Sequence, residues 1–273
     1  RPRGRGQEVT PTPVKTAAQE AGIDRILQPE DVTDPAFAEA VAEVAPDVIA
    51  VVAYKILPPE VFTAARKGAF NLHGSLLPKY RGAAPINHAV MAGESTTGVT
   101  TFFLEPSVDT GDIILQKEMS IGPNETAGSV HDRMAELGAD AVVETVRQLD
   151  EGTVETRPQD DEKATPAPKI HDADCETPWE ASAQEVHNHV RGLSPYPGAW
   201  TQHGDTRLKL YRTRRAEGTG APGEVLEANG RLLVACGTGA VEVLTLQQPG
   251  RKRLDAPDFL NGYALSAGDR LGE

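Results

Sequence analysis

Apolar residues in the first half of the chain recur at two spacings, one typical of helices and the other of buried strands. The helical spacing predicts helices at 13–22, 34–44, 58–66, 84–91 and 129–151. Short apolar runs, continuous or alternating, predict strands at 26–27, 48–54, 68–73, 98–104 and 113–118. Helices that alternate with buried strands are typical of an α/β domain built on a parallel sheet. We expect this domain to occupy residues 1–158.

The second half of the chain has a different pattern. Residues 159–170 are polar and contain Pro166 and Pro168, which predicts a linker. One short helix is expected at 183–191. Four short strands, separated by glycine-containing turns, are expected at 207–212, 223–228, 232–236 and 241–246. Short strands at regular spacing predict a small β-barrel, which we assign to a second domain at 171–273.

Polar side chains gather where the strand at 68–73 ends. Asn71 and His73 are two residues apart, so on a strand they point to the same face. Ligands of open α/β sheets lie outside the carboxyl ends of the strands. Gly74 and Pro78 predict an irregular loop after this strand, and a second loop contributes Asp109. An amide, an imidazole and a carboxylate in one pocket are the groups that a polar transfer reaction needs.

Each of these residues also has a structural interpretation. A histidine near a strand end is commonly a satisfied structural residue, and Asp109-Thr110-Gly111 is a typical turn sequence. The spacing of the pair is therefore weak evidence by itself, and the interpretation depends on the longer strings around it.

Four strings carry a family resemblance. Residues 71–87 read NLHGSLLPKYRGAAPIN, 97–100 read TGVT, 109–113 read DTGDI, and 190–200 read VRGLSPYPGAW. Together they resemble the formyltransferases that use 10-formyltetrahydrofolate, and most closely those that act on methionyl-tRNA. The resemblance covers almost the whole chain.

The resemblance implies a Rossmann-like formyltransferase domain followed by an OB-like β-barrel. It implies transfer of a formyl group from 10-formyltetrahydrofolate to initiator methionyl-tRNA, by a cytoplasmic, monomeric enzyme that needs no metal. Asn71, His73 and Asp109 match the family's catalytic residues. The loop of Ser75, Leu76, Leu77 and Pro78 matches part of the folate site, whereas Tyr80 and Arg81 fit either a surface or a substrate-side role.

Two features near the amino terminus depart from the family pattern. The chain opens on the basic loop RPRGRGQ, ahead of which family members carry a strand, a helix and a second strand. We therefore expect an amino-terminally truncated first domain. By resemblance this loop grips the tRNA acceptor end through Arg5, although a flexible charged terminus would have the same composition. Many family members have a glycine directly after the tyrosine at position 54, where this chain has Lys55.

Charge limits the kind of nucleic-acid binding that we expect. The net charge of −13 argues against bulk binding, but residues 171–273 are closer to neutral, with 11 basic and 14 acidic residues. Two basic clusters there suit tRNA phosphates, or else form a solvated face. Their members are Arg207, Lys209, Arg212, Arg214 and Arg215, and then Arg251, Lys252 and Arg253.

The rest of the composition restricts the class of protein. No apolar window is long enough for a transmembrane helix. Cys175 and Cys236 are too few for a metal cluster or a disulfide framework, and they fit a reducing compartment.

Three alternatives remain open at this point. They are a formyltransferase that acts on an amino sugar nucleotide, a formyltetrahydrofolate hydrolase, and an RNA-binding protein with a decayed catalytic domain. The family's glycinamide ribonucleotide enzymes lack a second domain, so residues 171–273 argue against that acceptor.

Overall fold

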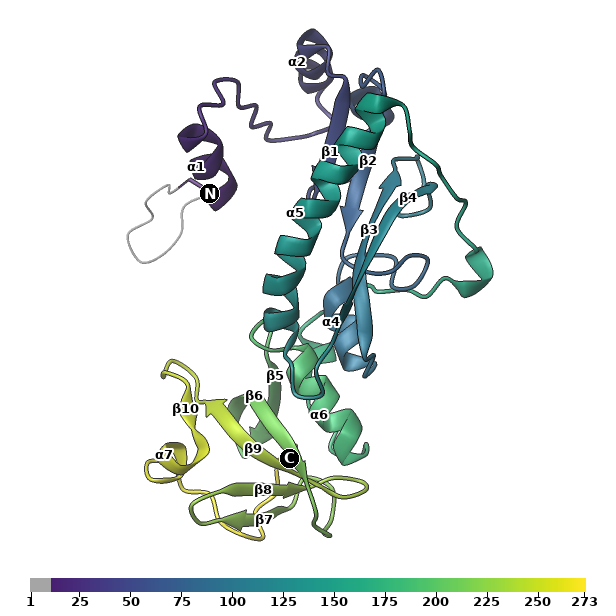
Figure 1. Ribbon diagram of the computed structural model, residues 1–273. Coiled ribbons are helices and arrows are strands. Elements are labelled where there is room, and N and C mark those ends of the chain that lie inside the picture. The colour runs from purple at the N-terminus through teal and green to yellow at the C-terminus, as the bar shows by residue number, and fades with distance from the viewer. Residues whose placement is uncertain (1–10) are drawn as a thin grey trace.

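The computed structural model describes residues 11–273 and has two domains, one above the other in Figure 1. The first domain contains a four-stranded sheet with a long helix, α5, across it. The second contains a curled six-stranded sheet. Among the described residues, no helix is both long and apolar enough to span a membrane.

The elements of the first domain follow the predicted order. Its helices are α1 (Pro13–Glu20), α2 (Pro35–Val44), α3 (Pro59–Phe62), α4 (Pro85–Met91) and α5 (Ala127–Glu151). Its strands are β1 (Val48–Val52), β2 (Gly68–His73), β3 (Thr96–Phe103) and β4 (Ile113–Ser120). The strands lie in the order β1-β2-β3-β4. β1 and β2 are parallel, whereas β3 and β4 run antiparallel to their neighbours, so the sheet is mixed.

Helix α5 holds this sheet together. Its apolar stripe contributes Val130, Met134 and Ala141 to a buried cluster that also contains Val99 of β3. Gly138 allows the close approach of helix and sheet, because a Cβ there would lie 2.8 Å from Leu72 Cδ2. The helix begins at a capping box formed by Thr126 and Ser129 and ends at Gly152 in a left-handed conformation.

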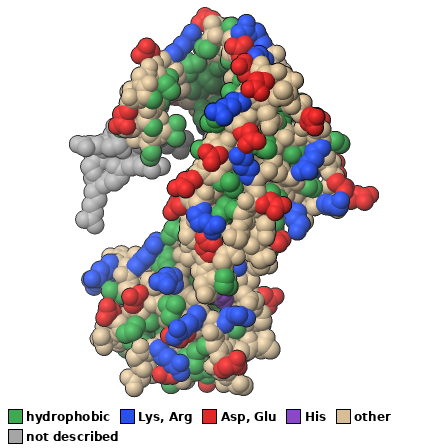
Figure 2. All heavy atoms as spheres, in the orientation of Figure 1, with side chains coloured by type: hydrophobic (Ala, Val, Ile, Leu, Met, Phe, Trp, Pro, Cys, Tyr) green, Lys and Arg blue, Asp and Glu red, His purple; other side chains and the backbone are tan. Residues whose placement is uncertain are grey.

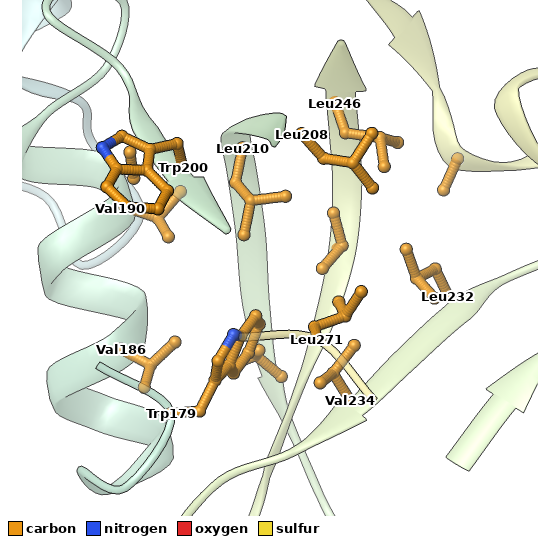
Figure 3. Close-up of a cluster of buried hydrophobic side chains, with 14 of the residues drawn as sticks. Trp179, Val186, Val190, Trp200, Leu208, Leu210, Leu232, Val234, Leu246 and Leu271 are labelled. Atoms are coloured by element: carbon orange, nitrogen blue, oxygen red, sulfur yellow. The ribbon is translucent and has the colours of Figure 1, made fainter. Parts of the chain in front are cut away.

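The second domain is built on its own core. Its strands are β5 (Ala199–His203), β6 (Thr206–Ala216), β7 (Val225–Ala228), β8 (Leu232–Ala235), β9 (Ala240–Gln247) and β10 (Leu254–Asp255). Its helices are α6 (Ala183–Gly192) and α7 (Ala256–Leu260). The sheet order is β5-β6-β9-β8-β7, with β10 on β9. Figure 3 shows side chains of α6 and the strands packed around Trp179 and Trp200, whose ring nitrogens donate hydrogen bonds to Thr201 Oγ1 and the Asp172 carbonyl.

Helix α6 also joins the two domains. Arg191 donates to the carbonyls of Gly122 (3.3 Å) and Glu125 (3.0 Å), which lie just ahead of α5. Gly192 packs so tightly on α4 that a Cβ there would lie 2.3 Å from Met91 Cγ. Residues 190–200, which carry part of the family resemblance, therefore lie at the domain junction.

Several elements differ from the sequence prediction. No strand forms at 26–27 within the described chain, where two apolar residues have no neighbouring strand to pair with. The helix at 58–66 ends at Phe62, because the amides of Arg66 and Lys67 bond to the carbonyls of Pro46 and Asp47 instead. Strands β5 and β10 and helix α7 were not predicted.

Candidate active site

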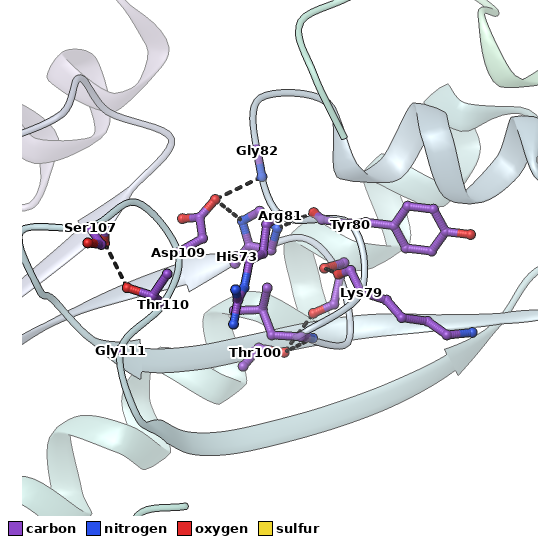
Figure 4. Close-up of polar contacts among 12 residues, drawn as sticks. His73, Lys79, Tyr80, Arg81, Gly82, Thr100, Ser107, Asp109, Thr110 and Gly111 are labelled. Carbon is purple, nitrogen blue, oxygen red and sulfur yellow. Dashed lines mark hydrogen bonds and ion pairs between the residues drawn. The ribbon is translucent and has the colours of Figure 1, made fainter. Parts of the chain in front are cut away.

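The three predicted catalytic residues lie together at the end of β2. His73 is the last residue of β2 and is 6% exposed, and Asp109, from the loop between β3 and β4, is 7% exposed. The shortest distance between them joins His73 Nδ1 to Asp109 Oδ2 and is 3.8 Å. The Gly82 amide donates to the same carboxylate oxygen at 2.9 Å. Figure 4 shows these groups converging from three separate segments.

The hydrogen bonds of His73 fix the roles of its two ring nitrogens. His73 Nε2 lies 2.8 Å from the backbone carbonyl of Tyr80. A carbonyl oxygen only accepts, so Nε2 carries the hydrogen. Nδ1 is then the nitrogen that is free to take a proton, and it faces Asp109. Tyr80 presents its carbonyl to His73 from a left-handed backbone conformation, with φ of 62°.

Asn71 lies two residues before His73 on β2 and is half-buried. Its Oδ1 atom is buried without a hydrogen-bond partner among the described residues. A buried amide oxygen that is left unpaired is costly, so an incoming N–H or O–H donor that bonds to it gains that free energy. Asn71 is therefore available to a ligand.

The predicted folate loop is attached to the sheet. The hydroxyl of Thr100, on β3, donates to the Ser75 carbonyl at 2.6 Å and accepts from the Leu77 amide at 3.1 Å. Gln116, on β4, donates to the Leu77 carbonyl at 2.9 Å. Ser75 and Leu77 are buried, whereas Leu76 and Pro78 are half-buried. The first two thus fix the shape of the loop, and the other two are accessible for contact.

Residues 157–168, which we call the strap, run along both loops of the site. The Arg81 amide donates to the Thr165 carbonyl (2.9 Å), and the Ala167 amide donates to the Arg81 carbonyl (2.6 Å). The Thr165 hydroxyl accepts from the Tyr80 amide at 2.9 Å. Gln159 reaches the loop that carries Asp109. Composition predicted this segment as a linker, and no sequence pattern singled out Gln159 or Thr165.

The side chains next to the site have structural partners. The Tyr80 hydroxyl donates to Glu94 at 2.8 Å, and burial together with this carboxylate raises the tyrosine's pKa above its usual range. Arg81 bonds to Gln159 and Asp161, and Lys55 is exposed and donates to the Glu30 carbonyl. These contacts favour a positioning role for Arg81.

The predicted tRNA-binding residues fall into two groups, and Arg5 lies outside the described residues. Several are already engaged: Arg207 with Asp172 and Trp200, Arg214 with the buried Glu242, Lys209 with the Pro197 carbonyl, and Arg253 with the Tyr211 ring. Arg212, Arg215, Arg251 and Lys252 are exposed and make no side-chain hydrogen bond or ion pair with described residues. Figure 2 shows blue side chains over this domain.

A groove of about 670 Å³ lies where the two domains meet. The first domain lines it with residues of α4 and the start of α5, and the second with Tyr211, Arg212 and Arg253. Tyr196, at its edge, is 82% exposed. The groove thus combines basic and aromatic side chains.

Comparison with protein families matches both parts of the chain. A family model described as formyl transferase matches residues 1–146, and one described as formyl transferase, C-terminal domain, matches residues 169–264.

Solved structures share the fold at low sequence identity. The HypX protein of Aquifex aeolicus, in complex with tetrahydrofolic acid, has a TM-score of 0.63 and 22% identity, and the match covers 82% of this chain and 40% of that one. The methionyl-tRNA formyltransferase of Clostridium thermocellum has a TM-score of 0.56 and 18% identity, with 75% and 88% covered. The sugar formyltransferase WlaRD has a TM-score of 0.64 and 15% identity, with 88% and 82% covered.

Curated relatives are closer in sequence. The methionyl-tRNA formyltransferase of Chlorobium phaeovibrioides is 46% identical over 275 residues, which is 99% of this chain and 86% of the relative. The enzyme of the same name from Geobacter metallireducens is 44% identical, with 100% and 88% covered. The chain therefore belongs to the formyl transferase family and, within it, to the methionyl-tRNA formyltransferases.

Proposed function

We propose that this protein transfers a formyl group from 10-formyltetrahydrofolate to the amino group of initiator methionyl-tRNA, with Asn71, His73 and Asp109 as catalytic residues. The observation that carries the proposal is the convergence of His73 and Asp109, 3.8 Å apart, two residues along β2 from Asn71, whose Oδ1 has no partner among the described residues. The acceptor follows from relatives of that name at 43–47% identity over nearly the whole chain.

The reaction makes two demands on the protein. As the amine attacks the formyl carbon, the carbonyl oxygen becomes an oxyanion that needs hydrogen-bond donors. The attacking nitrogen loses a proton, and the departing folate nitrogen gains one, so a group must carry a proton between them.

One of the three residues suits each demand. The Asn71 amide donates to the oxyanion without a change in its protonation. His73 Nδ1 takes the amine proton, because Nε2 is already committed to the Tyr80 carbonyl. The imidazolium formed lies beside the Asp109 carboxylate, which stabilises it. His73 then returns the proton to the folate nitrogen as the carbon–nitrogen bond breaks.

We place the folate along the loop at 75–78. The backbone groups of Ser75 and Leu77 are held by Thr100 and Gln116, so this loop keeps one shape. The half-buried Leu76 and Pro78 offer an apolar surface of the kind that a flat ring prefers. A rigid loop of this kind fixes the position of the formyl donor before the acceptor binds.

We place the acceptor arm of the tRNA along the groove between the domains. Arg212 and Arg253 lie on its wall and suit phosphates, and the exposed Tyr196 suits stacking on a base. The amino-sugar and hydrolase alternatives remain outcomes of the test below. The likeness to sugar formyltransferases at 15–19% identity concerns the fold alone.

The decisive experiment follows both products separately. The purified protein is incubated with 10-formyltetrahydrofolate and methionyl initiator tRNA, and formyl-methionine and tetrahydrofolate are measured over time. Equal amounts of the two products establish the transfer. Tetrahydrofolate alone indicates a hydrolase or another acceptor, and neither product from folded protein favours the RNA-binding alternative.

Single substitutions test the residue assignments in the same assay. Loss of an oxyanion donor or of the proton carrier typically removes about 100-fold or more of the rate. We expect Asn71→Ala, His73→Ala and Asp109→Ala each to reach that loss with an unchanged thermal midpoint. Near-normal turnover by His73→Ala would rule out its assigned role.

A further inference from the structure

Gln159 uses its whole side-chain amide at the junction of the strap and the two active-site loops. Its Nε2 atom donates to the carbonyls of Asp109 (3.0 Å) and Gly111 (2.8 Å). Its Oε1 atom accepts from Arg81 Nε (3.0 Å) and Nη2 (2.7 Å). One half-buried side chain thus ties the loop of Asp109 to the loop that follows β2.

Asp109 depends on this kind of support. Its backbone is in the left-handed region, with φ of 57°, which few non-glycine residues adopt, although aspartate does so more readily than most. Two residues on, a Cβ at Gly111 would lie 1.8 Å from the Phe103 carbonyl oxygen, so the loop also passes very close to β3. Its backbone carbonyls need donors, and Gln159 supplies two of them.

The side chain of Asp109 is held separately. Its Oδ2 accepts from the Gly82 amide and lies 3.8 Å from His73 Nδ1. Gly82 directly follows Arg81, the residue whose guanidinium Gln159 holds. Gln159 therefore binds the backbone of Asp109 on one loop and the side chain of Arg81 on the other. It contacts neither the His73 ring nor the Asp109 carboxylate.

We propose that Gln159 is a positioning residue for the reaction, which sets the separation of His73 and Asp109 by binding the two loops to each other. This inference rests on the catalytic roles proposed above. Through Gln159, the strap then supports the active site as well as forming the covalent connection to the second domain. Reaction rates are sensitive to such placement, and a displacement of about 1 Å can cost roughly 100-fold.

The chemistry of the site explains why glutamine is needed. Two carbonyls require two N–H donors, and the Arg81 guanidinium requires an acceptor; a primary amide supplies both. Glutamate has the same shape and keeps the acceptor, but its carboxylate would face the two carbonyl oxygens without a donor. Methionine keeps the length of the side chain and provides neither.

The experiment compares Gln159→Glu and Gln159→Met with a matched control, Asp161→Asn. Asp161 is the exposed second partner of Arg81, and its substitution leaves all four bonds of Gln159 in place. For each variant we would measure kcat, KM for both substrates, the dissociation constant for 10-formyltetrahydrofolate and the thermal midpoint.

We expect both Gln159 variants to lose about tenfold or more in kcat, with KM for the folate and its dissociation constant changed much less. Asp161→Asn should retain the kcat of the parent protein. A lower thermal midpoint with unchanged kcat would show a purely structural role and overturn the inference, as would an equal loss of kcat in Asp161→Asn.

The variant Asp109→Asn distinguishes a failure of this inference from a failure of the proposed catalytic role. If Asp109→Asn turns over normally, the proposed catalytic role of Asp109 fails. If Asp109→Asn is inactive while both Gln159 variants turn over normally, the catalytic role stands and the positioning role of Gln159 is wrong.

Discussion

Gly82 is the residue at which the active-site loop, Asp109 and the strap meet. Its amide donates to Asp109, its φ is +126°, and a Cβ there would lie 2.5 Å from the Ala167 carbonyl oxygen. Gly82→Ala therefore adds both backbone strain and a clash with backbone that cannot turn away. We expect lower thermal stability and a large loss of turnover, since the donor to Asp109 must move.

A matched control separates the effect of backbone strain from the effect of the clash. Gly230 also has a positive φ, +77°, but a Cβ there would meet no atom of the described residues within 4 Å. Gly230→Ala should cost about 1–2 kcal/mol of unfolding free energy and leave kcat unchanged. Equal effects of the two substitutions on stability and turnover would contradict the role given to Gly82.

At the residue scale, the sequence was most informative where chemistry and spacing coincide. The positions of Asn71 and His73 on one strand placed them on one face, and the structure brings His73 next to Asp109 as expected. Gln159 and Thr165 could not be found in this way. Their hydrogen-bond partners lie 48–85 residues away along the chain, and a polar residue in a proline-containing segment carries no sign of such a partner.

At the scale of elements, helix α6 makes stability depend on pH. His187 is buried at the domain junction, between Thr213 Oγ1 (2.9 Å) and the Pro123 carbonyl (3.0 Å). Burial, and next the nearby charges of Arg191 and Arg215, lower the pKa of His187, and burial lowers the pKa of His189 as well, against the opposing effect of carbonyl hydrogen bonds. The folded state thus keeps both rings neutral at pH values where the unfolded chain binds protons.

The sign of the effect follows from that difference. When the unfolded state binds more protons, the free energy of unfolding falls as the pH falls, by at most about 1.4 kcal/mol per pH unit for each proton. We expect the thermal midpoint to drop as the pH is lowered through the ordinary histidine range, near 6.5, and His187→Gln to reduce this slope. An unchanged slope in His187→Gln would show that the pH dependence arises elsewhere.

Elements with a strong local signal were predicted well. The capping residues of α2, α5 and α6 and the apolar stripe of α5 are properties of neighbouring residues, and these helices lie within three residues of their predicted bounds. The elements that the sequence did not predict correctly depend on contacts between residues far apart in the chain. β5 and β10 are short strands that exist because β6 and β9 pair with them, and the early end of α3 is set by hydrogen bonds to residues 46 and 47.

At the scale of the whole molecule, an acidic protein must bind a polyanion. The chain has a net charge of −13, so attraction of tRNA depends on where the unneutralised cations lie. Eight basic side chains of the second domain were predicted to suit tRNA phosphates. Two of them, Arg207 and Arg214, are neutralised by Asp172 and Glu242. Arg212, Arg215, Arg251 and Lys252 are exposed and make no side-chain hydrogen bond or ion pair with described residues.

Those four residues should therefore contribute most to the salt dependence of tRNA binding. Each phosphate contact contributes roughly 0.7–0.9 to the slope of log affinity against log salt. We expect Arg212→Ala, Arg215→Ala, Arg251→Ala and Lys252→Ala each to weaken tRNA binding and to reduce that slope by somewhat less than about one unit. Arg231→Ala is the control, because Arg231 is paired with Glu227 on the far β7–β8 hairpin. Binding of 10-formyltetrahydrofolate, measured in parallel, should be nearly independent of salt in every variant. A salt-independent affinity for tRNA would mean that shape and base contacts, and not this basic surface, hold the acceptor.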